Sequence, residues 1–553
     1  MIAGARRAIE PAWIAALVVV CAAALALRLI GLRYGLPAVY NPDEVAIMSR
    51  ALAFATGDLN PHNFLYPSFY FYVLFAWEGL TALWSVAIGA VASLGDFQRQ
   101  FFIDPTRVYV AGRLLTTLTG VLTVAATYSL GRRVAGPLAG LSAALFLAIA
   151  PLHVRDSHYV KHDVPVTLLI VVAYVAYERL WNAPPDDRSR TPLIAAAAAT
   201  GAAFSTHYYS IFLAIPLAWS AAQGARDRRE AFRRIALAAV VSGAVFFVLS
   251  PFILAEPSLA LRDIRANRQI VVDRAIGTLG YGETAARYAA FLWRDGVGWP
   301  VVLAAIIGIA TGARNRPRTT AWLLSFPIPF LLFIAGTYPA TRYLIPVLPF
   351  VAIFGGMGIA ALSSAHTVVA AAALAAVCVV PLRDSIRIDL FIRHADTRTL
   401  AERFIETAVP SGSTILTQPY SVPLTASADV LREAVARSGR DMPTRTRLEI
   451  ARQPYPSPSY RLIYLGRGLD VDKLYLPYDQ LDGGDPISPV RRERVAFVVL
   501  KRYNTPDPAT LPLLTALARE GRRIAVFSPY RDGSGGAGPE PFLHNTDARI
   551  DPL

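Results

Sequence analysis

Two adjacent acids stand near the start of the chain, a short distance beyond its first apolar run. Asp43 and Glu44 follow the turn-forming pair Asn-Pro and open the stretch DEVAIMSRALAFATG, which ends on Gly57. Because apolar residues recur there at helical spacing, the sequence predicts an amphipathic helix in the membrane interface, with both acids in its first turn. A carboxylate in this place could deprotonate or orient a hydroxyl group. The alternative is that the acids only complement the helix dipole.

A cluster of charged and imidazole side chains follows later, in the stretch HVRDSHYVKHDVP at 153–165. It contains His158, Lys161, His162 and Asp163, and Lys161 is the only lysine before residue 473. An ammonium group and imidazoles at a membrane surface suit a phosphate or pyrophosphate group. The alternative is a solvated loop that happens to be charged.

A third polar site precedes an apolar run near residue 350. Arg342 and Tyr343 stand at the start of RYLIPVLPF. An arginine at such a place either extends harmlessly to the membrane surface or binds a lipid-linked phosphate, and both interpretations stay open.

These residues need a membrane-spanning framework to bring them together. The chain has 553 residues, 54% of them hydrophobic, and a mean hydropathy of +0.40. Apolar runs of about 20 residues can cross a hydrocarbon core of roughly 30 Å as helices. The sequence predicts an α-helical polytopic membrane protein with about 11 to 13 such helices. The candidate runs are 12–32, 68–91, 108–130, 137–151, 164–181, 192–206, 208–222, 234–254, 298–313, 320–337, 341–362 and 366–381.

The net charge of +14 indicates orientation in the membrane and no nucleic-acid partner, because the arginines gather in short blocks between apolar runs, at 5–7, 131–133, 225–234 and 313–318. The positive-inside rule makes these blocks cytoplasmic. The loops on the extracytoplasmic side are then 33–67, 152–163 and 255–297. A full crossing by the run 68–91 would invert this arrangement. Either that run is re-entrant or lies against the bundle, or a shorter segment does not cross.

The chain changes character near residue 383, so we predict a membrane domain over 1–383 and a soluble extracytoplasmic α/β domain over 384–553. Leu400, Phe404 and Ile405 recur at helical spacing, and STILT at 413–417 has the composition of a strand. Strand and helix signals repeat in RLIYLG, RVAFVVLKRY and LLTALAREGRRIAVFS.

The order of several motifs resembles that of the C-type (GT-C) membrane glycosyltransferases. After the N-terminal span come DE at 43–44, YPSFYFYV at 66–73, RLLTTLTG at 113–120, DVPVT at 163–167 and RYLIPVLP at 342–349. The pattern is similar to the bacterial relatives of protein O-mannosyltransferases and of the lipid A aminoarabinose transferase, the family 39 or RgtA/B/C/D-like group. The resemblance covers about residues 10–360, and the opening of the C-terminal region resembles the extracytoplasmic domain of many members.

The resemblance implies an inverting transfer of a sugar from a polyprenyl-phosphate donor to a glycan, lipid or protein acceptor, at the extracytoplasmic face of the bacterial inner membrane. By position, Asp43 corresponds to the acid that acts as base or orients the acceptor, with Glu44 beside it. Asp163 corresponds to an acid that stands just before a helix. Arg342 and Tyr343 match the RY element near the donor phosphate.

The chain departs from the family pattern at residues 65–66, and the resemblance leaves metal use open. Leu65 and Tyr66 occupy the places where relatives have an acid and a base, so Lys161 or His162 is expected to contact the donor phosphate instead. Some members of the wider fold bind a divalent cation through loop acids. Asp43, Asp163 and His162 are therefore candidate ligands for Mg²⁺ or Mn²⁺, and Asp163 and His158 are candidates for positioning the acceptor or the metal.

The rival hypothesis is a lipid-linked sugar transporter or a non-catalytic partner in envelope glycan assembly. A transporter more often places ionisable groups near the membrane midplane, and Glu78 is the main candidate there. The sequence does not identify the sugar or the acceptor, although HYYS at 207–210 and the loop 255–297 are candidates for the acceptor side.

Overall fold

The computed structural model describes residues 2–182, 190–223, 225–269, 280–337, 339–363, 366–481, 485–501 and 508–528, with side chains from Pro11 onward. The chain divides into two compact units. The first, here called the membrane unit, comprises Met1–Leu32, Asp43–Thr81 and Tyr109–Leu390. The second, here called the α/β unit, comprises Arg33–Pro42, Ala82–Val108 and Phe391–Leu553. The predicted boundary at residue 383 lies inside helix α19 (Thr367–Arg393).

Long apolar helices build the membrane unit. They are α1 (Ile2–Leu29), α3 (Phe69–Ala87), α5 (Thr106–Ala135), α8 (Asp163–Trp181), α11 (Arg228–Leu249), α15 (Trp299–Asn315), α18 (Leu348–Ser363) and α19, with the shorter α6 (Pro137–Ala148), α9 (Thr191–Phe204), α10 (Ala214–Gln223), α16 (Pro317–Leu324) and α17 (Pro327–Ile334). Within the described residues, eight helices or continuous helical runs are long and apolar enough to cross a membrane. A bent pair, Tyr281–Gly296 with Trp299–Asn315, would make a ninth. The predicted polytopic helical architecture is confirmed.

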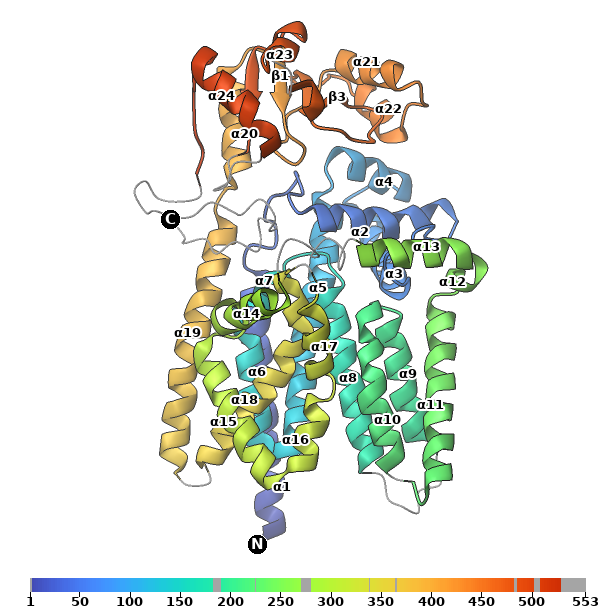
Figure 1. Ribbon diagram of the computed structural model, residues 1–553, viewed down its shortest axis with the longest axis vertical. Coiled ribbons are helices and arrows are strands. Elements are labelled where there is room, and N and C mark those ends of the chain that lie inside the picture. The colour runs from blue at the N-terminus through green and yellow to red at the C-terminus, as the bar shows by residue number, and fades with distance from the viewer. Residues whose placement is uncertain are drawn as a thin grey trace. The chain divides into compact units, whose positions relative to one another are not determined.

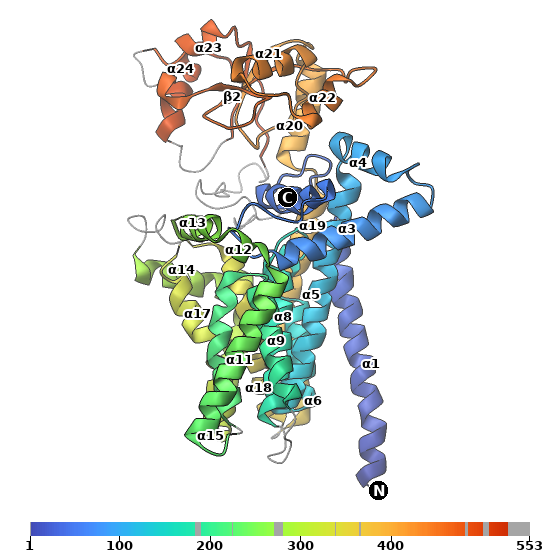
Figure 2. The ribbon, with the colours of Figure 1, turned by 90° about the vertical axis from the view of Figure 1, so that its right-hand side faces the viewer.

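Short helices gather at one end of this bundle, where α2 (Pro42–Ala53), α7 (Pro151–Asp156), α13 (Pro257–Arg268) and α14 (Tyr281–Phe291) lie (Figures 1 and 2). The predicted loop 255–297 is therefore largely helical in its described part. The opposite end holds the N-terminus of α1, the end of α5, the start of α11 and the end of α15. The arginine blocks at 131–133, 225–234 and 313–318 lie at those three helix ends.

Helix α3 has a different direction from its neighbours. It is seen nearly end-on in Figure 1 and lies across the end of the bundle in Figure 2. This orientation favours the alternative in which the run 68–91 lies against the bundle, and it keeps the arginine blocks on one side. Which side faces the cytoplasm stays a prediction.

Glycines allow the central helices to touch through their backbones. A Cβ atom on Gly308 of α15 would lie 1.8 Å from the Phe354 carbonyl oxygen of α18, and one on Gly356 of α18 would lie 2.2 Å from the Ala139 carbonyl oxygen of α6. Small residues at such contacts give membrane helices their close packing.

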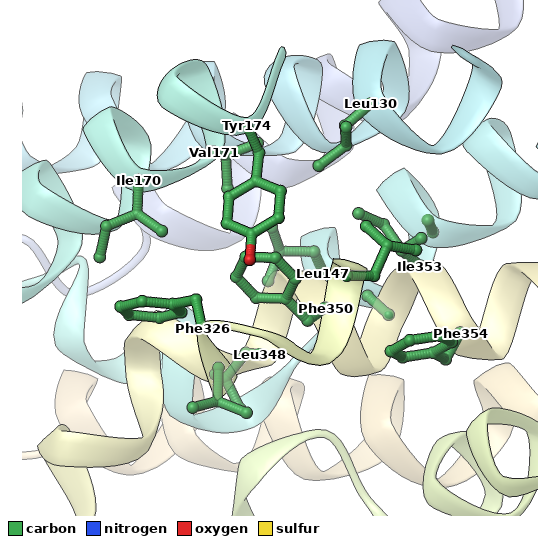
Figure 3. Packing of buried hydrophobic residues seen from close by; sticks show 14 of the residues in the cluster. Leu130, Leu147, Ile170, Val171, Tyr174, Phe326, Leu348, Phe350, Ile353 and Phe354 are labelled. Carbon is green, nitrogen blue, oxygen red and sulfur yellow. The ribbon is translucent and has the colours of Figure 1, made fainter. Parts of the chain in front are cut away.

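Aromatic side chains fill the space beside α18 (Figure 3). The Tyr174 ring of α8 lies 4.7 Å from the Phe350 ring of α18, measured between centroids, and the Tyr174 hydroxyl donates a hydrogen bond of 3.3 Å to the Trp322 carbonyl oxygen. This packing fixes α8 against α16 and α18. It therefore also fixes the residues at the ends of α8 and α18.

The α/β unit contains a four-stranded, fully parallel sheet in the order β3–β2–β1–β4. The strands are β1 (Thr414–Thr417), β2 (Arg461–Leu465), β3 (Leu474–Leu476) and β4 (Phe497–Val499). Helices α20 (Thr397–Ala408), α21 (Ala428–Ser438) and α24 (Leu511–Glu520) accompany it. The predicted helix near Leu400 and the strands β1, β2 and β4 are confirmed. The expected strand after α24 is wrong, since described residues 521–528 contain no strand, and β3 was not predicted.

Candidate functional site

Asp43 lies between two cations that come from distant parts of the chain. Its Oδ2 atom is 3.5 Å from the Lys161 Nζ and 3.2 Å from the Arg342 Nη1. The Asp43 side chain keeps 31% of its surface exposed, whereas that of Lys161 keeps 3%. A carboxylate that a substrate could reach is thus held by a buried ammonium group and a mostly buried guanidinium group.

Local structure explains how each of these three side chains reaches the site. Helix α2 begins at Pro42, so Asp43 lies in its first turn, as predicted. Lys161 follows α7 and stands two residues before the start of α8, and Arg342 lies in the 3-10 helix η5 (Thr341–Val347). The Arg155 Nη2 of α7 donates a hydrogen bond of 2.8 Å to the Thr341 Oγ1, which ties the segment carrying Lys161 to the segment carrying Arg342.

Asp163 and Tyr343 join the same group. Asp163 is buried at the first position of α8, and its carboxylate interacts electrostatically with Arg342 and Lys161. The guanidinium carbon of Arg342 lies 5.4 Å from the centroid of the Tyr343 ring, within the range of a cation–π contact. Asp43, Lys161, Asp163 and Arg342 are called the ionic cluster below.

Glu44 does not share the site with Asp43. Its carboxylate is fully buried and accepts hydrogen bonds from the Arg113 Nε at 2.9 Å and the Arg113 Nη2 at 2.8 Å. Its Oε1 also accepts the Val160 N–H at 2.9 Å, and the Arg113 Nη1 donates to the Leu32 carbonyl oxygen at 2.9 Å. Glu44 therefore joins α2 to α5 and to the segment before Lys161, and the geometry supports a positioning role instead of the expected catalytic one.

His162 is an aromatic neighbour of the cluster and not a cation within it. Its ring stacks on Tyr66 with centroids 4.4 Å apart and touches Tyr70 and Phe71 at 4.8 and 5.1 Å. Burial lowers the pKa of His162 to about 3, so the imidazole is uncharged at neutral pH. The expected ionic contact of His162 with the donor phosphate is not supported, and Lys161 and Arg342 supply the positive charge.

His158 lies elsewhere. Its Nδ1 is 2.9 Å from the Val154 carbonyl oxygen and its Nε2 is 2.7 Å from the Ile30 carbonyl oxygen. Each ring nitrogen faces a backbone carbonyl oxygen, of Val154 in α7 or of Ile30 just after α1, and the nitrogen that carries the proton donates to it. This arrangement suits a structural residue better than one that positions an acceptor or a metal.

The residues at the site do not fit the expected divalent cation. Across the ranges that the structure describes, no group of three or more His, Cys, Asp or Glu side chains could hold a metal ion. The Asp43 carboxylate faces Lys161 and Arg342, whose positive charges oppose a second cation. The charges around Asp43 therefore argue against a metal site formed by Asp43, Asp163 and His162.

Some residues of the site were not singled out from the sequence. Arg113 is the buried partner of Glu44. Its place inside an apolar run could have indicated a buried ion pair, because an arginine there needs an acidic partner. Tyr66, His207 and Tyr209 form ring contacts around His162. HYYS at 207–210 had been noted only as a candidate for the acceptor side.

Comparisons with known proteins support the helical membrane fold described above. Residues 107–254 match the family model described as dolichyl-phosphate-mannose-protein mannosyltransferase. No match was found among curated protein sequences. Among solved structures, ArnT from Cupriavidus metallidurans bound to undecaprenyl phosphate aligns with 15% sequence identity and a TM-score of 0.52, covering 92% of each chain.

Two further structures align with the chain. ArnT in the apo state aligns with 16% identity and a TM-score of 0.51, covering 93% of this chain and 92% of that one. The oligosaccharyltransferase AglB from Archaeoglobus fulgidus, in complex with an inhibitory peptide and a dolichol-phosphate, aligns with 13% identity over 73% of this chain and 62% of that one. The TM-score of this alignment is 0.46. The ArnT alignments and the family model confirm the resemblance that the motif order indicated: this chain has the GT-C fold of membrane glycosyltransferases.

Proposed function

We propose that this protein is an inverting glycosyltransferase that moves a sugar from a polyprenyl-phosphate donor to a hydroxyl group of a glycan, lipid or protein acceptor. The reaction takes place at the extracytoplasmic face of the bacterial inner membrane. The observation that carries the proposal is the Asp43 carboxylate held between Lys161 and Arg342. The GT-C fold and the matched family model support the same reaction class.

The ionic cluster supplies the two functions that this transfer needs. The acceptor oxygen attacks the anomeric carbon from the face opposite the phosphate, and its proton passes to Asp43. The bond from the anomeric carbon to the phosphate oxygen breaks, and its electron pair leaves with polyprenyl phosphate. Lys161 and Arg342 stabilise the charge that grows on the departing phosphate. A single displacement of this kind inverts the anomeric configuration.

Before the donor binds, Lys161 and Arg342 also keep Asp43 from acting as a base. Both cations contact the same oxygen, Oδ2. A donor phosphodiester competes for these cations and thereby releases the carboxylate toward the acceptor.

The test is sugar transfer by the purified full-length protein, comparing wild type with Asp43→Asn on a panel of polyprenyl-phosphate sugars. The readout is release of polyprenyl phosphate, with and without a chelator. Asp58→Asn is the matched control, because Asp58 is exposed and its contact with His62 lies outside the cluster. We expect release by wild type and by Asp58→Asn and none by Asp43→Asn.

An active Asp43→Asn protein would remove the proposed base. No release from any donor, together with saturable lipid binding, would instead favour a transporter or a non-catalytic partner. Loss of activity with chelator would show that the reaction uses a metal, contrary to the donor set around Asp43.

A further inference from the structure

Four aromatic side chains adjoin the ionic cluster and form a group called the aromatic box here: Tyr66, His162, His207 and Tyr209. Tyr66 stacks on His162 and meets the His207 ring edge-on, with centroids 5.2 Å apart. His207 stacks on Tyr209 at 3.7 Å. Tyr66 and His207 are partly exposed, whereas His162 and Tyr209 are buried.

The box contains polar atoms that the described protein leaves unsatisfied. The His162 Nε2 and the Tyr209 hydroxyl are buried and have no hydrogen-bond partner among the described residues. The His207 Nδ1 accepts the Tyr209 N–H at 3.4 Å, so a neutral His207 carries its proton on Nε2 and can donate from there. Buried polar atoms of this kind are costly unless a ligand or water satisfies them.

The box borders the place where the donor phosphate would lie. Tyr66 interacts electrostatically with Arg342, Asp43 and Asp163, and Tyr209 interacts with Asp163 and Arg342. A sugar attached to a phosphate at Lys161 and Arg342 would therefore lie in the neighbourhood of these rings.

The charges around the aromatic box limit which sugars it can bind. Arg50 of α2 interacts with both Tyr66 and His162, and Arg342 interacts with Tyr66, His207 and Tyr209, so these two cations adjoin the box directly. Lys161 joins them through Asp43. The two carboxylates of Asp43 and Asp163 and the single charge of a donor phosphodiester balance the three cations. Neighbouring ions are paired with each other: Arg113 with Glu44, Arg155 with Asp156, and Asp263, which also interacts with Arg50, with Arg262.

The rings of the box add no charge. Burial lowers the pKa of His162 to about 3 and holds the pKa of His207 well below its usual value, so both imidazoles are neutral at pH 7. Flat rings suit the C–H faces of a sugar, and a few inward polar groups suit its hydroxyls.

We propose that the aromatic box receives the sugar of the donor and selects an uncharged sugar over an amino sugar or a uronic acid. This inference rests on the proposed function, because it assumes that the phosphate of a sugar donor lies at Lys161 and Arg342. An ammonium or carboxylate group on the sugar would add an uncompensated charge beside cations and carboxylates that already balance each other, and the neutral imidazoles offer it no counter-ion. The cation–π attraction of the tyrosine rings for an ammonium group is weaker than the cost of burying that charge.

The first test varies only the sugar. Purified full-length protein receives polyprenyl-phosphate donors that carry a neutral hexose, a neutral pentose, a 4-amino-4-deoxypentose or a hexuronic acid, and kcat/KM is measured from the release of polyprenyl phosphate. We expect kcat/KM to be at least about 10²-fold lower for both charged sugars than for the better neutral one. Equal or faster transfer of a charged sugar would overturn the inference while leaving the enzyme established.

The second test separates sugar contacts from phosphate contacts. Tyr66→Leu removes the stacking ring, Tyr66→Phe keeps it, and Tyr420→Leu is a matched control at an exposed tyrosine of the α/β unit. We expect Tyr66→Leu to raise the donor KM about tenfold and to leave the Kd for sugar-free polyprenyl phosphate unchanged. Tyr66→Phe should retain most of the donor affinity that Tyr66→Leu loses, and Tyr420→Leu should match wild type.

A Tyr66→Leu protein that binds sugar-free polyprenyl phosphate as poorly as it binds donor would assign Tyr66 to the phosphate or to the fold and overturn the inference. If wild type releases nothing from any donor, the proposed function fails. Competition between the neutral and the charged lipids for binding then still tests the box: tighter binding of the neutral lipids supports it, and equal or weaker binding refutes it.

Discussion

Breaking the buried ion pair between Glu44 and Arg113 tests whether this contact holds Lys161 in place beside Asp43. Both side chains are almost completely buried, with two hydrogen bonds of 2.8 and 2.9 Å between them. Glu44 also accepts the Val160 N–H, one residue before Lys161. Arg113→Met leaves the buried Glu44 carboxylate without its ionic partner. Glu44→Gln leaves the buried Arg113 guanidinium group without its ionic partner, but it keeps an oxygen that can accept the Val160 N–H.

The magnitude follows from burial. Two unit charges about 4 Å apart attract by about 4 kcal/mol at an effective dielectric constant of ~20. Removal of one partner from a buried pair costs about 3–5 kcal/mol, because the other charge is left uncompensated. We therefore expect each single variant to lower the free energy of unfolding by about 3–5 kcal/mol. The double variant Glu44→Gln/Arg113→Met should be at least about 2 kcal/mol more stable than the sum of the single effects predicts.

The assay is a double-variant cycle on the denaturant midpoint of the full-length protein in one detergent, with transfer activity measured in parallel. Arg432→Met is the control, since Arg432 and its partner Asp429 are both exposed and their pair should contribute no more than about 1 kcal/mol. Activity should be lost in the single variants and partly recovered in the double variant. Single variants as stable as wild type, or strictly additive effects, would refute the reasoning.

Three further outcomes are expected. Because the pKa of His162 is about 3 in the folded protein and near 6.5 in an unfolded chain, the unfolded state binds more protons below pH 6.5; the unfolding midpoint should fall with acidification and fall less steeply in His162→Phe. Gly308→Ala should destabilise the protein by about 3 kcal/mol or more, since its Cβ would overlap the Phe354 carbonyl oxygen, whereas Gly243→Ala in open space should be neutral or slightly stabilising in the same thermal unfolding series. Arg342→Met should raise the Kd for polyprenyl phosphate at least about tenfold in a lipid-binding titration, and Arg342→Lys less, because a charge-assisted contact is lost.

Residues that typically begin or end a helix allowed some helices to be predicted from the sequence. The Asn-Pro pair and the following acids placed the start of α2, and Gly57, with a φ of 92°, stands just after its final turn. Strand β3 has only Leu474–Leu476, too few residues for alternation to be visible. Helix α13 was read as part of a loop because its sequence, PSLALRDIRANR, is polar on average and carries three arginines.

The site was predictable where the type of charge was unusual for its context. Lys161 stood out as the single lysine of a charged cluster, Arg342 as an arginine at the start of an apolar run, and both reach Asp43. The geometry favours a positioning role for Glu44 over the predicted catalytic one, because successive residues of a helix point about 100° apart and two adjacent acids therefore face different neighbours. The neutrality of His162 depends on rings contributed by α3 and by the segment before it, which sequence spacing alone does not bring together.

The shared oxygen of Asp43 has a consequence for the order of events in the proposed reaction. While Lys161 and Arg342 both hold Oδ2, the carboxylate is neutralised and is a poor acceptor for a proton. A donor phosphodiester draws the same two cations toward itself, so Asp43 becomes an effective base only when the group to be displaced is in place. An acceptor that arrives first meets a carboxylate still bound by its cations. Under the proposed mechanism, donor binding therefore precedes acceptor deprotonation, and the same coupling would protect the acceptor hydroxyl from deprotonation without a sugar to receive it.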